Sequence, residues 1–342
     1  MTYIFKFRPY QRRFVRSLTT NHGTWDIREG IILRLTDESG KVGWGEIAPI
    51  SWFGSETLEQ ALDFCRQLPG EITDEIIFSI PDELPACQFG FESACGSEFF
   101  SMPNAPCPMT AVAPLGETPR PHCLLHAQSF SGLLPSGEAA LNQWETLWQQ
   151  GYRTFKWKIG VDAIANELKI FESLIRTLPA STKLRLDANG GLTYEEANLW
   201  LRTCDNLKAN PELPLEIEFI EQPLPVEQFQ QMLKLSTSYE TAIALDESVA
   251  TLRQLVACYQ QGWRGIFVIK PGIVGSPSCL RKFCHQYKID TVFSSVFETA
   301  IARFAALKIA AELSRNNRAV GFGIDHFFEQ EETWLQSLWN DL

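Results

Sequence analysis

Five short segments decide the fold: FKWKIG (155–160), RLDANG (185–190), EFIEQP (218–223), ALDES (244–248) and VIKPG (268–272). Each is an apolar run typical of a β-strand that ends in a charged residue and is followed by residues common in turns. A charge that ends a buried strand rarely serves a hydrophobic core. Five such strand ends in succession therefore indicate a barrel of parallel strands whose C-terminal mouth carries the chemistry.

The surrounding sequence repeats a pattern of strand and then helix. Strands are expected near residues 123–128, 153–158, 182–187, 215–221, 241–246, 265–270 and 290–295, and a last short one in AVGFGI (319–324). Helical periodicity fills the intervals. Repeated units of this kind form parallel sheets with right-handed crossovers, and seven or eight of them close into a barrel. We therefore predict an α/β fold, a TIM-like barrel of parallel strands, over residues 116–324.

The first 115 residues follow another pattern. Apolar and polar residues alternate up to about residue 48, with Ser39 and Gly40 at an expected hairpin turn, and helical spacing starts at Glu56. A proline-rich stretch without periodicity, residues 101–121, marks a connection between domains. We predict an α+β domain over residues 1–115, against which the C-terminal tail packs.

Composition narrows the class of protein. A chain of 342 residues with 45% hydrophobic residues can bury a large core, and its net charge of −11 without Lys or Arg clusters disfavours a nucleic-acid partner. The start has no signal-peptide pattern, and no apolar run of about 20 residues could cross a bilayer. Nine cysteines without CxxC spacing are typical of reduced thiols. We expect a cytoplasmic protein without a membrane partner.

Lys156 and Lys158 stand two residues apart, so their side chains point to one side of the strand while Trp157 points to the other. Two ammonium groups on an inner face repel each other and are poorly solvated. Both effects lower the pKa of a lysine towards the range of a general base. The alternative is a pair of solvated lysines on an edge strand, since lysine is rarely buried.

Asp187, Glu221 and Asp246 each end a predicted strand. Consecutive parallel strands lie about 4.8 Å apart, so three carboxylates at equal heights can converge on one hard cation. Ligation by oxygen alone indicates Mg²⁺, which Mn²⁺ can replace. Strand alternation is expected to turn Glu218 and Glu247 away from this site. The alternative is that each carboxylate lies in a turn or caps the next helix.

Lys270 ends the next strand and is expected across the barrel from Lys158. The pattern suggests a substrate held between two ammonium groups, with its carboxylate on Mg²⁺. A tuned lysine then takes the proton α to that carboxylate, and the metal stabilises the resulting enediolate. The segments thus predict an enzyme that acts on a small-molecule carboxylate.

In this order KxK, DANG, EQP, DES and VIKPG, following an α+β domain, resemble the enolase superfamily, specifically its muconate-lactonizing-enzyme subgroup. The resemblance covers nearly the whole chain. It implies a (β/α)₇β barrel, essential Mg²⁺ held by the three carboxylates, and a capping domain of residues 1–115 and about 325–342. It also implies Lys158 as the general base, Lys156 as its partner and Lys270 as the opposing lysine. A mandelate-racemase-type enzyme would instead have a His of a His-Asp dyad where VIKPG lies.

Within the subgroup the candidates are o-succinylbenzoate synthase, dipeptide epimerase, N-acylamino acid racemase and muconate cycloisomerase. Arg185 in RLDANG is similar to the synthase pattern, with a strand arginine paired to a nearby carboxylate as the alternative. Dipeptide epimerases carry Asp-x-Asp on the last strand, where this chain has Gly323, Ile324 and Asp325. The resemblance therefore implies the synthase activity, a hydro-lyase step of menaquinone or phylloquinone biosynthesis. Racemase or epimerase activity is the alternative.

Two loops are expected to contact the substrate. The segment with Trp52, Phe53 and Gly54 resembles the capping-domain loop that closes over the substrate. Its aromatic side chains suit an aromatic or cyclohexadiene ring, although exposed aromatics also pack at domain interfaces. Ser294 and Ser295 follow the seventh predicted strand, where they either hydrogen-bond a second carboxylate or serve as turn residues.

Overall fold

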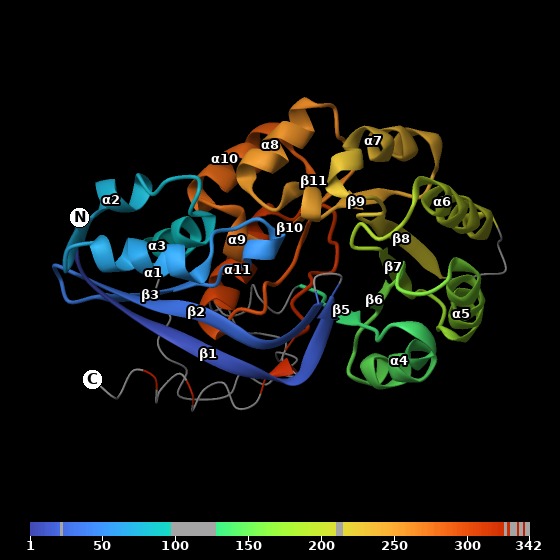
Figure 1. Ribbon diagram of the computed structural model, residues 1–342, viewed down its shortest axis with the longest axis horizontal. Coiled ribbons are helices and arrows are strands. Elements are labelled where there is room, and N and C mark those ends of the chain that lie inside the picture. Colours follow the sequence, from blue (N-terminus) through green and yellow to red (C-terminus); the bar gives the residue numbers. More distant parts are fainter. Residues whose placement is uncertain are drawn as a thin grey trace, which may run out of the picture.

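The computed structural model describes residues 1–20, 23–96, 128–209 and 215–324, and also Phe327, Phe328, Trp334 and Leu338. A four-stranded antiparallel sheet near the N-terminus is followed by a seven-stranded parallel sheet (Figure 1). Both predicted parts of the fold, the α+β unit and the α/β barrel, are therefore confirmed.

The N-terminal sheet has the strand order β3-β2-β1-β4. Its strands are β1 (Thr2–Thr20), β2 (Gly23–Asp37), β3 (Val42–Ile47) and β4 (Glu71–Thr73), and its helices are α1 (Leu58–Gln67), α2 (Asp74–Phe78) and α3 (Pro85–Gly96). The predicted hairpin turn lies between β2 and β3, where Gly40 adopts a φ of 81° that glycine tolerates. Asp37 stabilises the turn by accepting hydrogen bonds from the backbone amides of Ser39 and Lys41.

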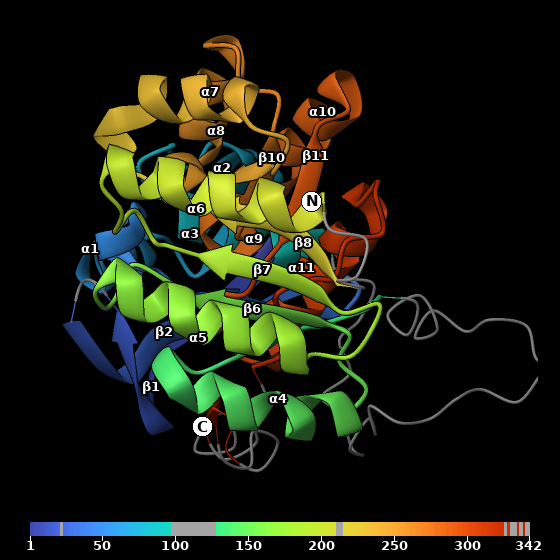
Figure 2. The same ribbon diagram turned by 90° about the vertical axis from the view of Figure 1, so that its right-hand side faces the viewer.

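The parallel sheet runs in chain order from β5 to β11. Its strands are β5 (Ser131–Leu133), β6 (Thr154–Lys158), β7 (Lys183–Asp187), β8 (Glu216–Glu221), β9 (Ile243–Leu245), β10 (Ile266–Ile269) and β11 (Asp290–Phe293). The helices are α4 (Ala140–Gln149), α5 (Ile164–Thr177), α6 (Tyr194–Lys208), α7 (Phe229–Ser238), α8 (Leu252–Gln260), α9 (Pro271–Val274), α10 (Pro277–Tyr287) and α11 (Ala300–Leu313). Figure 2 shows α4, α5, α6 and α7 side by side along the outside of the sheet.

The predicted eighth strand closes the sheet. The Val320 amide donates a hydrogen bond to the Ser129 carbonyl, and the Val320 carbonyl accepts one from the Ser131 amide. On the other side, the Gly321 amide donates to the Phe293 carbonyl. The segment around Val320 therefore pairs with both edges of the sheet, next to β5 and next to β11. Such pairing completes the predicted (β/α)₇β barrel.

The first barrel strand was predicted at residues 123–128, but the described strand, β5, begins only at Ser131. Residues 123–127 lie outside the described part of the chain. The other six predicted strands are present, although β9, β10 and β11 are shorter than expected because the chain turns at their polar ends.

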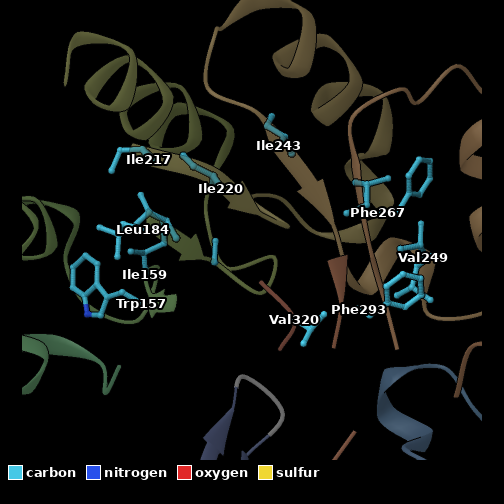
Figure 3. Packing of buried hydrophobic residues seen from close by; sticks show 14 of the residues in the cluster. Trp157, Ile159, Leu184, Ile217, Ile220, Ile243, Val249, Phe267, Phe293 and Val320 are labelled. Atoms are coloured by element: carbon cyan, nitrogen blue, oxygen red, sulfur yellow. The ribbon is translucent and has the colours of Figure 1, made fainter. Parts of the chain in front are cut away.

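Strand alternation separates an inner face from an outer face. Trp157 stacks on Phe171 of α5 and meets Trp200 of α6 edge-on, so it packs outside the sheet as predicted. Figure 3 shows such outward side chains from successive strands, among them Ile220 and Phe267. A small separate cluster fills the inside: Phe219, Ala244, Ile266, Val268 and Val292. Lys156, Lys158 and the strand-end charges alternate with the outer set and therefore belong to the inner face.

The described tail residues contact the N-terminal sheet. Phe328 lies 4.9 Å from Phe14 between ring centres, and Trp334 packs edge-on against Tyr10 of β1. These contacts support the predicted capping domain, whose limits at residues 1–115 and about 325–342 stay a prediction. No described helix is both long and apolar enough to cross a membrane. The seven described cysteines are free thiols, as expected.

Candidate active site

The charged strand ends meet at one end of the barrel. Lys158, Asp187 and Glu221 are the last residues of β6, β7 and β8, and the register pairs them directly across the sheet. Asp246 and Lys270 follow β9 and β10 without an intervening residue. Because parallel strands end at the same edge, all five side chains belong to the C-terminal mouth.

Lys156 joins two of the predicted metal ligands. Its Nζ lies 2.7 Å from Asp187 Oδ2 and 2.7 Å from Glu221 Oε1. Burial by itself lowers the pKa of Lys156, but the charges of Asp187 and Glu221 outweigh it, and the pKa is raised. The expectation of a lowered pKa is therefore wrong for Lys156, because repulsion by one lysine is weaker than attraction by two carboxylates. Lys156 stays protonated and acts as a fixed cation.

Lys158 behaves differently although it lies only two residues further on. Burial and the nearby Lys156 lower its pKa, against an opposing effect of Asp187. No ion pair or hydrogen bond of its ammonium group is found within the described ranges. Lys158 is thus a half-buried lysine with the lowered pKa that the sequence predicts.

Lys270 faces the mouth from β10, with β7, β8 and β9 between it and Lys158 in the sheet. Its ammonium group donates to Asp246 Oδ1 and lies 4.1 Å from the centre of the Phe53 ring. Phe53 belongs to a short 3₁₀ helix of the N-terminal domain, η1 (Ser51–Phe53). The mouth is therefore built by both domains.

The three predicted metal ligands are buried, and two of them, Glu221 and Asp246, have raised pKa values. Burial raises the pKa of Glu221 to about 8, and the charges of Asp187 and Asp246 add to the effect. Burial likewise raises the pKa of Asp246 to about 6, against the attraction of Lys270. Negative charge crowded in this way is what a bound divalent cation neutralises.

The donor set fits a hard cation, although it is not arranged as a cage. Within the ranges that the structure describes, no three Asp, Glu, His or Cys side chains form a ready-made metal site. Lys156 and Lys270 instead hold carboxylate oxygens that a cation would use. Oxygen donors alone, with no His or Cys among them, favour Mg²⁺ over a softer metal.

Glu247 and Asn189, which the sequence interpretation left out of the site, also lie at the mouth. Glu247 was expected to diverge from the site, but its Oε1 accepts a hydrogen bond of 3.1 Å from Asn189 Nδ2. It also lies close enough to Lys158 to oppose the lowering of its pKa. The prediction failed because alternation ends with the strand: the chain turns at Asp246, with φ −122° and ψ −75°, into the 3₁₀ helix η5 (Glu247–Val249). Both residues stand within the quoted motifs, Asn189 in DANG and Glu247 in DES.

Arg185 and Glu218 form a buried ion pair. The Arg185 Nε lies 2.6 Å from Glu218 Oε2, and Arg318 approaches Glu218 Oε1 at 2.7 Å. A register shift in the pairing of β7 and β8, between Leu184 and Arg185, brings Glu218 to the inner face, contrary to expectation. The pairing matches the ion-pair alternative for Arg185, and a substrate contact of Arg185 stays a prediction.

The two serines differ in how their hydroxyl groups are used. Ser295 Oγ donates to Glu298 at 2.8 Å and accepts the backbone amide of Phe297 at 2.8 Å, so its hydroxyl proton is engaged within the loop. Ser294 is half-buried, and its hydroxyl makes a long contact of 3.5 Å to the Gly321 carbonyl as its one hydrogen bond to the described residues. Of the two predicted substrate contacts, Ser294 is the more available.

The loop of Trp52, Phe53 and Gly54 packs beside Lys270, and its closure over a substrate stays a prediction. Trp52 is 41% exposed, whereas Phe53 is buried against Lys270. Gly54 has φ 126°, and a Cβ there would lie 3.1 Å from the Cβ of Ala250, which directly follows η5. The loop thus sits on the barrel beside the mouth.

Comparison with known protein families identifies both domains of the chain. A family described as enolase C-terminal domain-like matches residues 139–337, and the MenC N-terminal domain matches residues 10–97. The first match alone covers more than half of the chain.

Individual relatives cover nearly the whole length. The o-succinylbenzoate synthase of Thermosynechococcus vestitus is 41% identical over 326 residues, which are 94% of this chain and 92% of the relative. The crystal structure of o-succinylbenzoate synthase from Thermosynechococcus elongatus BP-1, with Mg in its active site, matches with a TM-score of 0.82 and 39% identity over 99% of each chain. The L-Ala-D/L-Glu epimerase of Bacillus subtilis shares the fold, at TM-score 0.74 and 22% identity over 96% of this chain and 91% of that one. The chain belongs to the enolase superfamily, with an enolase-like C-terminal barrel and the N-terminal domain of MenC.

Proposed function

We propose that this enzyme is an o-succinylbenzoate synthase of menaquinone biosynthesis. It removes water from 2-succinyl-6-hydroxy-2,4-cyclohexadiene-1-carboxylate and leaves an aromatic ring. The observation that carries the proposal is 41% identity to such a synthase over 94% of the chain, together with the matching MenC N-terminal domain. The lysines and carboxylates at the mouth supply the groups that the reaction needs.

Lys158 is the general base in this proposal. The lowered pKa of its ammonium group, caused by burial and by Lys156, favours the neutral amine that accepts a proton. The amine takes the proton α to the substrate carboxylate. The same group then donates that proton to the departing hydroxide, so the C–H and C–O bonds break on one face and water leaves.

Lys270 has a different role because it stays paired with Asp246. It reaches the mouth from the far side of the sheet, so its positive charge faces the enediolate opposite Lys158. A fixed positive charge beside a developing negative charge lowers the barrier for proton removal.

Asp187, Glu221 and Asp246 would hold Mg²⁺, with Mn²⁺ as a substitute. When bound, the cation supplies positive charge that stabilises the enediolate. Lys156 holds Asp187 and Glu221 in place from inside the barrel. A structure of a relative contains Mg in its active site, which supports this assignment.

A dipeptide epimerase is the competing activity, since it needs the same lysines. Such epimerases place Asp-x-Asp on the last strand to bind an ammonium group, and here the first of these positions is Gly323. A Cβ at Gly323 would lie 2.9 Å from the Ser131 carbonyl oxygen and 3.0 Å from the Tyr152 hydroxyl. The backbone is therefore too close to β5 to carry an acidic side chain at that position. Asp325 lies outside the described residues.

A comparison of reaction rates with three separate substrates tests the proposal. The purified enzyme with Mg²⁺ is given the cyclohexadiene carboxylate, an N-succinyl amino acid or L-Ala-L-Glu, and kcat/KM is measured for dehydration or for α-proton exchange in D₂O. We expect dehydration to exceed both exchange reactions. Faster exchange of either amino-acid substrate would replace the synthase assignment.

A further inference from the structure

One carboxylate at the mouth has no role in the chemistry proposed so far. Glu247 directly follows Asp246 and begins η5. Its Oε1 accepts a hydrogen bond from Asn189, but its Oε2 is buried and has no hydrogen-bond partner in the part of the chain that the structure describes. A buried oxygen without a donor is unfavourable, and more so when it is charged. Most buried polar atoms in proteins have a partner, so this oxygen is a place for a donor outside the described protein atoms, such as a water.

Asn189 fixes Glu247 relative to a predicted metal ligand. Its backbone amide donates to Asp187 Oδ1 at 3.1 Å, and its side-chain amide donates to Glu247 Oε1 at 3.1 Å. The residue has φ 45°, in the left-handed region, which turns the two donors towards different carboxylates. One residue thus clamps Asp187 and Glu247 together.

The surroundings of Glu247 are strongly charged. Glu247 follows Asp246 directly in the chain and shares Asn189 with Asp187. Glu247 therefore adds a fourth carboxylate to the three predicted ligands, while the lysines that approach those ligands, Lys156 and Lys270, make no ion pair with it.

We propose that Glu247 is a positioning residue of the divalent-cation site, clamped by Asn189 so that Oε2 accepts a hydrogen bond from a water in the coordination shell of the cation. This inference rests on the proposed function, because it assumes that Asp187, Glu221 and Asp246 bind Mg²⁺. Acceptors in this outer position orient the inner ligands, and their loss typically weakens metal affinity about 10–100-fold.

The test measures Mn²⁺ binding by isothermal titration calorimetry on the substrate-free protein, so that it does not depend on turnover. Glu247→Gln keeps an oxygen for Asn189 but replaces Oε2 with an amide nitrogen that cannot accept a hydrogen bond. Asn189→Gly removes only the clamp, because glycine tolerates a φ of 45° and keeps the backbone amide. Glu216→Gln is the matched control, since it removes one negative charge from the exposed start of β8, where the Glu216 side chain is 55% exposed.

We expect Glu247→Gln to weaken Mn²⁺ binding about tenfold or more and Asn189→Gly to weaken it severalfold, with Glu216→Gln within twofold of the unmodified protein. Thermal unfolding of each variant checks that it is folded. If Glu247→Gln does not fold, Asn189→Gly decides alone. Affinities of Glu247→Gln or Asn189→Gly within twofold of the control overturn the inference. Absence of Mn²⁺ binding by the unmodified protein would instead contradict the proposed function, so the two failures are distinguishable.

Discussion

The ammonium group of Lys270 lies over the ring of Phe53, 4.1 Å from its centre, while it donates to Asp246. Phe53 comes from the N-terminal domain and Lys270 from the barrel, so the contact joins the two domains at the mouth. A cation above an aromatic face gains about 0.5–2 kcal/mol, more when it is shielded from water. The loop that contains Phe53 therefore holds and covers Lys270, the lysine proposed to lie opposite Lys158.

Replacing Phe53 with Leu is expected to lower kcat about fivefold, because about 1 kcal/mol of cation–π stabilisation is lost and the lysine is less well held. Phe53→Tyr keeps a ring face and should retain most of the activity. Steady-state kcat and KM of both variants check this. Equal kcat values for Phe53→Leu and Phe53→Tyr would contradict a role for the ring face.

Glu218 is expected to be essential for stability. One carboxylate serves both Arg185 and Arg318, and the Arg185 side chain is only 2% exposed. Glu218→Gln leaves the buried Arg185 without its counter-charge, while Arg318 keeps Asp290 at 2.7 Å, and the change should lower the free energy of unfolding by about 3–5 kcal/mol. Urea unfolding measures this loss. The exposed pair of Lys183 and Glu216 gives the comparison, since Glu216→Gln should cost less than about 1 kcal/mol.

The same ion pair makes stability depend on pH. Burial raises the pKa of Glu218, but the neighbouring Arg185 and Arg318 outweigh it, and the pKa lies below the ordinary value of 4.5. A lowered pKa in the folded state means that the stabilisation is fully present above the unfolded pKa and is lost as the pH falls through the folded pKa. The stability difference between the unmodified protein and Glu218→Gln should therefore be constant above about pH 5 and shrink below about pH 4.5. Urea titrations between pH 3 and 7 measure it, and a difference that grows on acidification would contradict the pairing.

Glu46 connects the N-terminal sheet to a barrel helix. From β3 it accepts hydrogen bonds from the Tyr10 hydroxyl, from Thr299 and from the Ala302 amide at the start of α11. Glu46→Ala should lower the free energy of unfolding by about 2–4 kcal/mol, since several bonds to one buried carboxylate are lost. Thr57→Ala, which removes the local cap of α1, should cost only about 1 kcal/mol. Similar losses in thermal unfolding of the two variants would show that Glu46 acts only as a local cap.

The barrel could be predicted because each strand carries its own signals. In Thr154–Lys158 and Lys183–Asp187 the alternation, the terminal charge and the following turn residues agree, and the structure places these strands within one residue of the prediction. The position of β5 was less predictable, since a strand of three residues holds too little alternation to fix its start. The pairing of Lys156 with Asp187 and Glu221 needed three strands in register, so its raised pKa could not be foreseen from one strand.

The remaining differences arise where regular geometry ends. Glu218 turns inward through a register shift between two strands, and no residue type in EFIEQP marks such a shift. Glu247 joins the mouth because the chain leaves the extended conformation at Asp246. Ser295 is engaged by Glu298, three residues later, through a loop conformation that alternation does not describe. Each is a local departure from strand geometry that depends on tertiary packing.

The most direct measurement follows the absorbance of the cyclohexadiene substrate after addition of the purified enzyme, with Mg²⁺ or with EDTA, beside Lys158→Ala. The account predicts rapid loss of absorbance with Mg²⁺ and none with EDTA. It also predicts a rate lower by about 10²–10⁴-fold for Lys158→Ala, because general-base catalysis contributes that much. A folded unmodified enzyme that leaves the substrate intact with Mg²⁺, or a Lys158→Ala variant as fast as the unmodified enzyme, would contradict it.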